Sequence, residues 1–418
     1  MKVFKFGGAS ISSVERIRHV GNIIRSFRGE KLLIVISAMG KTTNALEKVA
    51  EAFCTGNKAG ALSLFNQVKI EHTEVLKQLT GQSDQGLTDI FTEVEWLLHD
   101  KPVRQYDYYY DQIVCCGELL STAIVSSFLN TVDINNEWVD VRDIVRTDDN
   151  FRDAVIDWNF TLQKMQDVVL PLFDTSGIII TQGFIGATDE NESTTLGREG
   201  SDYSAAIFAN MLDAESQTIW KDVEGVMNAD PKLFPEARFI SRLSYREVIE
   251  MAYYGAQVIH PKTIKPLQNK GIPLHVRCFL NPASEGTIIS NKAVHELPPV
   301  IVVKPKQVLM QLSSRDFSFA EDRMAGRFHE LLLDCRVRPN LSQNGAITLL
   351  CCLDDIPLKI EKLALAASEF FDVQVEGNCT LLTIRHYDEA IIEKLTLGRT
   401  QLLSQKTQET IQLLLKDI

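Results

Sequence analysis

Glycine-rich loops carry the residues best suited to chemistry in this sequence. KFGGAS places Lys5 before two glycines, and TTLGREGSD, which runs from Thr194 to Asp202, places Arg198 between two more. Glycines allow an anion to approach backbone amides, and the N terminus of a following helix adds partial positive charge. Asp202 and Asp222 could also hold Mg²⁺ through water. This combination suits phosphoryl transfer, in which positioning and charge stabilisation provide most of the catalysis.

A third loop, SAMGKTTN from Ser37, resembles the end of a Walker A phosphate loop because glycine, lysine and threonine occupy residues 40–42. That motif needs another glycine five positions before Gly40, where the chain has Val35. No GxGxxG follows the first apolar run, which removes the main support for a dinucleotide dehydrogenase. We therefore predict neither a P-loop nor a dinucleotide-binding site.

Short strands followed by helices must position these loops. Apolar runs begin near Val3, Leu32, Gly177, Gln217 and Ile272, with helical patterns between them. This alternation predicts an α/β fold with a mainly parallel central sheet that helices cover on both faces. In such a sheet the loops at the carboxyl ends of the strands, among them KDVEGVMNADPK, face one crevice.

Local patterns also mark two helix starts and one unusual helix. Ser12 with Glu15, and Ser244 with Glu247, fit capping boxes at helix N termini. The segment QIVCCGELLSTAIVSSFL is an apolar helix that a single carboxylate, Glu118, interrupts. A carboxylate in such a helix should be paired or should line a cavity, so Glu118 belongs either to a structural ion pair or to a ligand site.

Composition sets limits on the protein's partners and location. The chain has 418 residues, enough for two or three domains. Its net charge of -12 argues against nucleic acid or an anionic membrane as a partner. The eight cysteines show no CxxC spacing and fit neither a metal knuckle nor a small disulfide scaffold. The N terminus fits neither a signal peptide nor a membrane span, so we predict a cytoplasmic protein.

A polar, proline-bearing link at residues 290–300 ends the alternating pattern. We place the domain boundary near residue 296, which gives domains of 1–296 and 297–418. Beyond it, the order strand, helix, strand, strand, helix, strand is that of small split α+β modules. A second module should be abbreviated, because the chain passes almost directly from TLLTIRHYDEAIIEKL through TQLLSQ to TIQLLLKD.

Six segments, in order along the chain, resemble the consecutive signature blocks of aspartate kinase: KFGGAS, SAMGKTTN, GELLS, TTLGREGSDYSAA, WKDVEGVMNADP and YGAQVIHPKTIKPLQNKGIPLHVRCFLNP. The blocks extend to about residue 290, and the remainder resembles the paired ACT domains of that enzyme. The resemblance implies the amino-acid kinase fold, with ATP and L-aspartate as substrates. It implies 4-phospho-L-aspartate and ADP as products, in the first step toward lysine, threonine, methionine and isoleucine.

The resemblance also implies a role for individual residues. Lys5 and Asp202 would be catalytic, and Mg²⁺ would accompany the ATP without a dedicated set of protein ligands. Aspartate would lie beside Thr43, Glu118, Arg198 and Ser201. The nucleotide would lie beside Lys5, Gly7, Gly8, Lys221, Asp222, Asp230 and Lys232.

The implied reaction needs no general base. A β-carboxylate has a pKa of about 4 and is already ionised at neutral pH, so the nucleophile needs orientation rather than deprotonation. Arg198 can hold the α-carboxylate through a bidentate fork, and Glu118 can accept the α-ammonium. Lys5 can then neutralise charge on the transferring phosphoryl group.

Two positions depart from the family pattern. Glu199 stands where the family often has glycine, so its carboxylate should point to solvent or pair with a cation. Gln257 stands where many relatives carry a lysine near the nucleotide. Two other interpretations stay open: another amino-acid kinase, of the glutamate 5-kinase or acetylglutamate kinase type, and a non-catalytic ACT-type amino-acid sensor.

The family's regulatory loop also looks altered. In the family an end-product amino acid binds between ACT units of two subunits, usually near a glycine in the loop after the first strand. Here that loop, SSRDFSFAEDRMAG, has no glycine before Gly326 and carries Asp316, Glu321 and Asp322. Like charges that close disfavour an anion. We therefore expect the ACT region to serve chiefly as the interface of a homodimer or higher homo-oligomer, with weak or absent inhibition by lysine or threonine.

Overall fold

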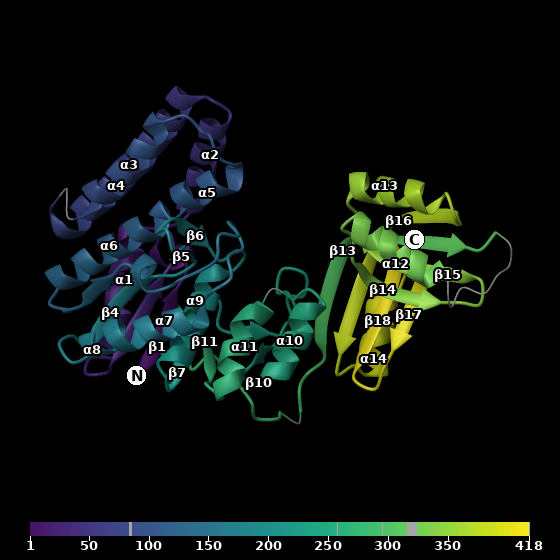
Figure 1. Cartoon of the computed structure of the whole chain (residues 1–418). Coiled ribbons are helices and arrows are strands. Elements are labelled where there is room, and N and C mark those ends of the chain that lie inside the picture. Colours follow the sequence, from purple (N-terminus) through teal and green to yellow (C-terminus); the bar gives the residue numbers. More distant parts are fainter. Residues whose placement is uncertain (83–85, 257, 295, 316–323, 418) are drawn as a thin grey trace. The chain divides into compact units, whose positions relative to one another are not determined.

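The protein divides into two compact units in a computed structural model that describes residues 1–82, 86–256, 258–294, 296–315 and 324–417 (Figure 1). Unit 1 comprises residues 1–226, 241–249 and 259–293, and unit 2 comprises residues 227–240, 250–258 and 294–418. The sequence suggested a single boundary near residue 296, whereas unit 2 also takes two short segments from the earlier part of the chain. Gln257 and the loop acids Asp316, Glu321 and Asp322 lie outside the described residues.

Unit 1 is built on an eight-stranded sheet in the order β10-β12-β11-β7-β1-β2-β4-β3. Every neighbouring pair is parallel except β11 with β12. The predicted mainly parallel α/β sheet is therefore confirmed. The strands are β1 (Lys2–Phe6), β2 (Leu32–Ile36), β3 (Glu137–Val139), β4 (Ile178–Gln182), β7 (Ser216–Lys221), β10 (Arg242–Ser244), β11 (Leu274–Cys278) and β12 (Thr287–Ser290).

Helices flank this sheet on both sides (Figure 1). The segment that the sequence marked as helical between residues 45 and 129 forms five separate helices, α2 to α6. The helices are α1 (Val14–Arg25), α2 (Thr42–Cys54), α3 (Lys58–Thr80), α4 (Leu87–His99), α5 (Tyr106–Val114), α6 (Cys116–Thr131), α7 (Trp158–Lys164), α8 (Leu170–Leu172), α9 (Gly200–Met211), α10 (Tyr245–Tyr253) and α11 (Pro261–Lys270). Shorter pieces are the 3₁₀ turns Gly8–Ile11 and Val141–Asp143, the π-helical turn Met165–Val169 and the hairpin of β5 (Ile185–Ala187) with β6 (Ser193–Thr195).

The cap of α1 lies one residue later than the sequence suggested. Ser13, not Ser12, is the N-cap, and its hydroxyl accepts a hydrogen bond from the Arg16 amide. The difference arises because a 3₁₀ turn follows the first strand and uses Ser12, whose hydroxyl donates to the Ala9 carbonyl. The second predicted cap is present, since the Glu247 amide donates to the Ser244 hydroxyl at the start of α10.

The stretch from Tyr106 to Thr131, covering α5 and α6, is long and apolar enough to pass a length and composition test for a membrane span. Its most apolar window, however, is 83% buried inside the structure. Core helices of folded proteins pass the same test, and the burial of this stretch is that of a core helix.

Unit 2 contains a six-stranded antiparallel sheet in the order β14-β15-β13-β16-β18-β17. Two strands that the sequence marked separately, FDVQV and TLLTIRH, are one strand, β16, and the strands β14 and β17 were not predicted. The elements are β13 (Val300–Ser313), α12 (Met324–Asp334), β14 (Pro339–Asn344), β15 (Thr348–Asp354), α13 (Pro357–Ala367), β16 (Asp372–Arg385), α14 (Glu389–Thr396), β17 (Arg399–Lys406) and β18 (Thr410–Asp417). Earlier in the chain, β8 (Val226–Met227) and β9 (Phe239–Ile240) form a separate two-stranded sheet.

The sheet of unit 2 is two half-sheets that share the 14-residue strands β13 and β16. The register between these strands breaks from Lys304 to Gln307, where Lys306 has a φ of 56°. On one side of the break the strand order is β14-β15-β13-β16, and on the other it is β17-β18-β16-β13. The first half carries two helices, α12 and α13, in the predicted split α+β order. The second half has the same four-strand order but one helix, α14.

Candidate active site

A cavity of about 410 Å³ lies in unit 1, where β1, β2 and β4 reach their carboxyl ends. Among its lining residues are all six that the resemblance assigned to catalysis or to aspartate: Lys5, Thr43, Glu118, Arg198, Ser201 and Asp202. The cavity also exposes Ser37, Tyr110, Arg152, Phe184 and Thr195, which the sequence did not single out. The fold thus brings together residues that are up to 197 positions apart in the chain, while their individual roles stay predictions.

Lys5 and Asp202 form a buried ion pair at this cavity. The Lys5 Nζ lies 2.6 Å from the Asp202 Oδ1, and the two side chains are only 12% and 6% exposed. Lys5 comes from β1, and Asp202 comes from the first turn of α9, where an acid is favoured by the helix dipole. Burial acts to raise the pKa of Asp202, but the charges of Lys5 and Lys221 outweigh it, so that pKa lies below its usual value. Asp202 is therefore ionised, and its carboxylate holds the Lys5 side chain in a buried position beside the cavity.

Glu118 lies on α6 and is 3% exposed. Its Oε1 accepts a hydrogen bond from the Ala38 amide at 3.2 Å, whereas its Oε2 has no hydrogen-bond partner in the part of the chain that the structure describes. Burial raises the pKa of Glu118 to about 8, although the Ala38 amide and the charge of Lys5 act in the opposite direction. No ion pair to Glu118 is present among the described residues, so the ligand interpretation fits better than the structural ion pair.

The turn that carries Arg198 is shaped by two glycines. Gly197 has a φ of +75°, and a Cβ there would lie 2.7 Å from the Asp153 carboxylate and 3.2 Å from the Arg152 carbonyl oxygen. A Cβ on Gly200 would lie 3.2 Å from the Cα of Phe184. The backbone therefore passes close to its neighbours on both sides, while the Arg198 side chain is exposed and makes no ion pair with another described residue.

Glu199 is exposed, as expected for an acid beside the proposed anion sites, and its carboxylate also has a backbone partner. Glu199 has a φ of 56°, and its Oε2 accepts a hydrogen bond from the His260 backbone amide at 3.0 Å. His260 is the N-cap of α11, and its own Nδ1 accepts from the Lys262 amide. The carboxylate therefore sits at the positive end of a helix, which reduces the repulsion that it would exert on an anion in the cavity.

Asp111, on α5, joins two segments that line the cavity. Its carboxylate accepts hydrogen bonds from the backbone amides of Arg152 and Thr195, at 2.9 and 2.8 Å, and from the Thr195 hydroxyl at 2.7 Å. Burial raises the pKa of Asp111 to about 6 despite these donors. No motif in the sequence marks Asp111, because the donors that surround it come from residues 41 and 84 positions away.

Arg152 brings a second guanidinium to the cavity. It adopts a φ of 69°, which favours glycine, and its guanidinium lies 3.1 Å from Asp107 and 4.4 Å from the centre of the Tyr110 ring. Non-glycine residues in this conformation concentrate at functional sites. A positive φ cannot be read from a sequence, so this residue could not have been found without the structure.

The residues assigned to the nucleotide, unlike those assigned to aspartate, do not all line one cavity. A Cβ on Gly8 would lie 2.5 Å from the Ala38 carbonyl oxygen, so Gly8 is needed for the contact between two loops. Asp222 is held by Arg16 through two contacts of 3.1 and 3.0 Å. Gly7, Gly8, Lys221 and Asp222 belong to unit 1 but do not line the cavity, whereas Asp230 and Lys232 belong to unit 2 and form a local turn in which the Lys232 amide donates to Asp230. Their nucleotide roles stay predictions.

The sheet of unit 1 is mainly parallel, with glycine-rich loops at the carboxyl ends of its strands and a charged cavity beside these loops. The sequence that forms it matches a known family. The model of the amino acid kinase family matches residues 1–278, and the chain belongs to that family.

Relatives within that family include aspartokinases. The lysine-sensitive aspartokinase 3 of Escherichia coli strain K12 is 29% identical over 392 residues, which cover 91% of this chain and 86% of that protein. The chloroplastic aspartokinase 1 of Arabidopsis thaliana is 32% identical over 330 residues, which cover 75% of this chain and 56% of that protein. This chain thus spans little more than half the length of the plant relative.

Solved structures give the same assignment of the fold. The E. coli aspartokinase III structure in complex with aspartate and ADP superposes with a TM-score of 0.81 at 26% identity, and the match covers 100% of this chain and 96% of that one. The aspartate kinase of Clostridium acetobutylicum gives a TM-score of 0.83 at 20% identity over 100% and 96% of the two chains, which supports the fold alone.

Proposed function

We propose that this protein is an aspartate kinase, which transfers the γ-phosphoryl group of ATP to the β-carboxylate of L-aspartate. The observation that carries the proposal is one cavity lined by two groups that lack a partner among the described residues: a buried carboxylate oxygen, Glu118 Oε2, and the guanidinium of Arg198. These two groups complement the ammonium and the α-carboxylate of a free amino acid. The names of the relatives support the same substrate.

The Lys5–Asp202 pair supplies the third part of the proposed site. A β-carboxylate oxygen attacks the γ-phosphorus, the bond from phosphorus to the bridging β-phosphate oxygen breaks, and ADP leaves. Negative charge on the transferring group is best stabilised by a cation that is already in position. Lys5 meets this requirement because Asp202 holds its Nζ at 2.6 Å and both side chains are buried.

The site also bears on the alternative kinases. An N-acetylated amino acid carries no ammonium, so it would offer no counter-charge to the ionised form of Glu118 and would leave its Oε2 without the cationic donor that a free amino acid supplies. Acetylglutamate is therefore a poor fit to this cavity. Glutamate presents the same ammonium and α-carboxylate as aspartate with one more methylene. The rates of ADP release with the two acceptors distinguish between them.

Mg²⁺ fits this site as a companion of the nucleotide. The described residues contain no group of three or more His, Cys, Asp or Glu side chains that could hold a metal. The nearby acids are already engaged, Asp202 with Lys5 and Asp222 with Arg16. Mg²⁺ is commonly bound through one or two carboxylates plus substrate phosphates. When bound, it would neutralise phosphate charge, and Asp202 is among the carboxylates lining the cavity that could reach it through water.

Two further parts of the proposal concern assembly and location. We propose that unit 2 mediates a homodimer or higher homo-oligomer, since a sheet whose outer strands are β14 and β17 has edges that need to be covered. We also propose a cytoplasmic site of action. Sedimentation of the full chain tests the first, and fractionation of the source cells tests the second.

The deciding experiment measures ADP release with Mg-ATP and, in parallel, L-aspartate, L-glutamate or N-acetyl-L-glutamate. We expect release only with L-aspartate, or far faster with it. A preference for either other acceptor would replace the proposed substrate, and no release with any of the three would favour the non-catalytic sensor.

A further inference from the structure

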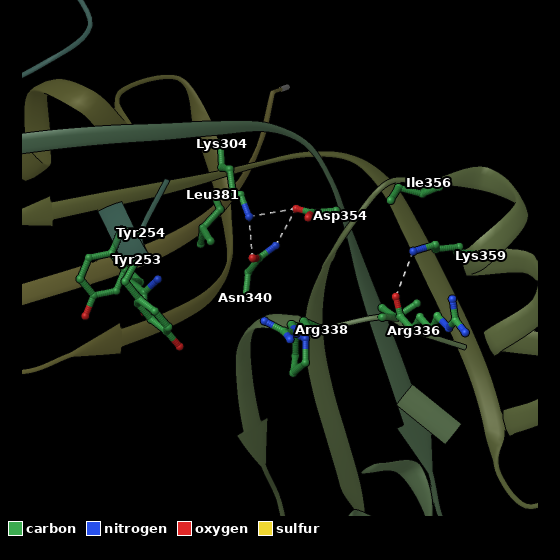
Figure 2. Close-up of a pocket in the computed structure, with 13 residues that line it drawn as sticks. Tyr253, Tyr254, Lys304, Arg336, Arg338, Asn340, Asp354, Ile356, Lys359 and Leu381 are labelled. Carbon is green, nitrogen blue, oxygen red and sulfur yellow. Dashed lines mark hydrogen bonds and ion pairs between the residues drawn. The ribbon is translucent and has the colours of Figure 1, made fainter. Parts of the chain in front are cut away.

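Unit 2 holds a second cavity, of about 460 Å³, within the size range of small-molecule sites. It is bounded by Lys304 of β13, by the segment 336–340 that leads into β14, by the start of α13 and by the tyrosines 253 and 254 (Figure 2). All of these residues belong to unit 2. None of them lines the cavity of the proposed kinase site.

The lining of this second cavity is strongly positive. Lys304, Arg336, Arg338 and Lys359 contribute four cationic side chains, and Asp354 is the acid among the lining residues. This concentration of positive charge occurs in a chain whose net charge is -12. Positive charge gathered in a hollow of an acidic protein raises the local concentration of anions there.

The one acid does not neutralise the arginines. The Asp354 Oδ1 lies 3.2 Å from the Lys304 Nζ and accepts hydrogen bonds from the side-chain amides of Asn340 and Gln307, at 2.8 and 3.0 Å. Figure 2 shows this cluster, in which Lys304, Asn340 and Asp354 point toward one another. Asp354 therefore pairs with Lys304 and with two side-chain amides. The positive charges of Arg336, Arg338 and Lys359 are not balanced by this acid.

Arg336 and Arg338 have no such partners. Their guanidinium groups make no hydrogen bond or ion pair with any residue that the structure describes, and both side chains are exposed. Elsewhere in unit 2, Arg315 and Arg327 each pair with a carboxylate. The two cavity arginines keep all of their donors available, and a planar guanidinium is suited to carboxylate and phosphate groups.

The backbone at Arg336 gives an independent indication. Arg336 follows the C-terminal end of α12 with a φ of 50°, in the left-handed region that favours glycine at this position of a helix terminus. Its carbonyl oxygen accepts a hydrogen bond from the Lys359 Nζ at 3.0 Å, which ties the strained residue to α13. A long cationic side chain thus stands where a residue without a side chain would fit the backbone better, and such strain concentrates at binding sites.

Apolar and aromatic groups complete the lining. Tyr253 is 74% exposed, and its ring meets that of Tyr254 edge to face with centroids 5.3 Å apart. Leu381 and Ile356 add apolar surface. A bare inorganic ion would use the cations but would leave these groups unused, so an organic ligand fits the cavity better.

We propose that this cavity of unit 2 binds a small organic polyanion, a molecule with two or more acidic groups and an apolar or planar part that rests against Tyr253. A phosphorylated compound and a polycarboxylate share this chemistry. The proposal concerns binding at unit 2 and does not depend on the substrate of the kinase site.

The test measures binding to the full chain by isothermal titration calorimetry at fixed ionic strength, with AMP and trimesate, an aromatic tricarboxylate, as the two probes. We expect saturable binding of one of them, weakened at least about tenfold in the double variant R336Q/R338Q, because each arginine supplies charge-assisted hydrogen bonds. The charge-matched control is the double variant R25Q/R28Q, at two exposed arginines of unit 1, and neither it nor Arg28→Gln alone should change the affinity. A stronger response to AMP identifies a phosphorylated ligand, and a stronger response to trimesate identifies a polycarboxylate.

A second variant keeps folding and binding apart. Arg336→Gly suits the left-handed backbone, so its thermal unfolding temperature should equal or exceed that of the parent while its affinity for the probe falls. Binding that is unaffected in both cavity variants, equally weakened in Arg28→Gln, or abolished only by Arg198→Ala in the kinase site would overturn the proposal. So would failure of both probes to bind.

Discussion

Replacement of Glu118 by glutamine should stabilise the protein and weaken its binding of aspartate at the same time. Burial raises the pKa of this carboxyl from its usual 4.5 to about 8. Between these two pH values the folded protein keeps the proton that the unfolded chain has released, so stability falls as the pH rises from 4.5 to 8. Above pH 8 the loss is complete, because the carboxylate is then ionised in both states.

The size of the effect follows from the difference between the two pKa values. About three and a half pH units, at about 1.4 kcal/mol each, correspond to roughly 5 kcal/mol. Water that enters the cavity lowers this figure, and we expect about 2–5 kcal/mol at pH 8. Glutamine has nearly the same shape, can still accept the Ala38 amide and carries no charge. Thermal unfolding of Glu118→Gln should therefore occur several degrees higher than that of the parent at pH 8, with a much smaller gain at pH 5.

The same substitution removes the charge that we assign to the substrate ammonium. The KM for aspartate should rise about tenfold or more, while the KM for ATP changes little. In the parent protein the KM for aspartate should also fall between pH 7 and pH 9, as Glu118 ionises, and this slope should disappear in the variant. An equal thermal gain at pH 5 and pH 8, or no gain at either, would refute the reasoning about the buried carboxyl.

Four other expectations are open to measurement. Lys5→Met should fold normally and lose two or more orders of magnitude in kcat, and near-normal turnover would remove Lys5 from the mechanism. Arg198→Ala should raise the KM for aspartate far more than the KM for ATP, and the reverse would contradict the assignment of Arg198 to the α-carboxylate. Arg152→Gly should relieve a left-handed backbone at no loss of stability but raise the KM for aspartate several-fold, whereas an unchanged KM would show that Arg152 only packs against Tyr110. Lysine or threonine at millimolar levels should inhibit the initial rate weakly or not at all, and strong inhibition that disappears on removing residues 300–418 would show that the acidic loop binds its ligand.

The strands and loops of unit 1 were predictable because their signals are local. The run LLIVI is buried at every position, as a central parallel strand requires. Gly8 of KFGGAS and both glycines of LGREG sit where the backbone has no room for a side chain or takes a positive φ. By contrast, the positions of Lys5, Glu118 and Arg198 along the chain do not tell how far apart these residues lie in space. Their assignment to one site came from the family resemblance, and the cavity supports it.

The residues that were missed share a physical reason. Asp111 matters because three donors from two distant residues, Arg152 and Thr195, converge on its carboxylate. Arg152 matters because of its positive φ, and neither property can be recognised in the sequence. The same holds for Glu199, whose partner is a backbone amide 61 residues away. In unit 2, β14 and β17 are mostly polar strands, and their segments PNLSQN and RTQLLSQK carry too few apolar residues in alternation to stand out.

The two strands that run through both halves of unit 2 have a consequence for how this unit unfolds. β13 and β16 pair on both sides of the break at Lys304–Gln307. Each is an inner strand of one half-sheet and the edge strand of the other, so neither half can open without disturbing its neighbour. The halves therefore form one cooperative unit, although each resembles a module that could fold alone. In native-state hydrogen exchange, the amides of Val302 and Met310 would belong to the same late-opening group, despite lying in different halves of the sheet.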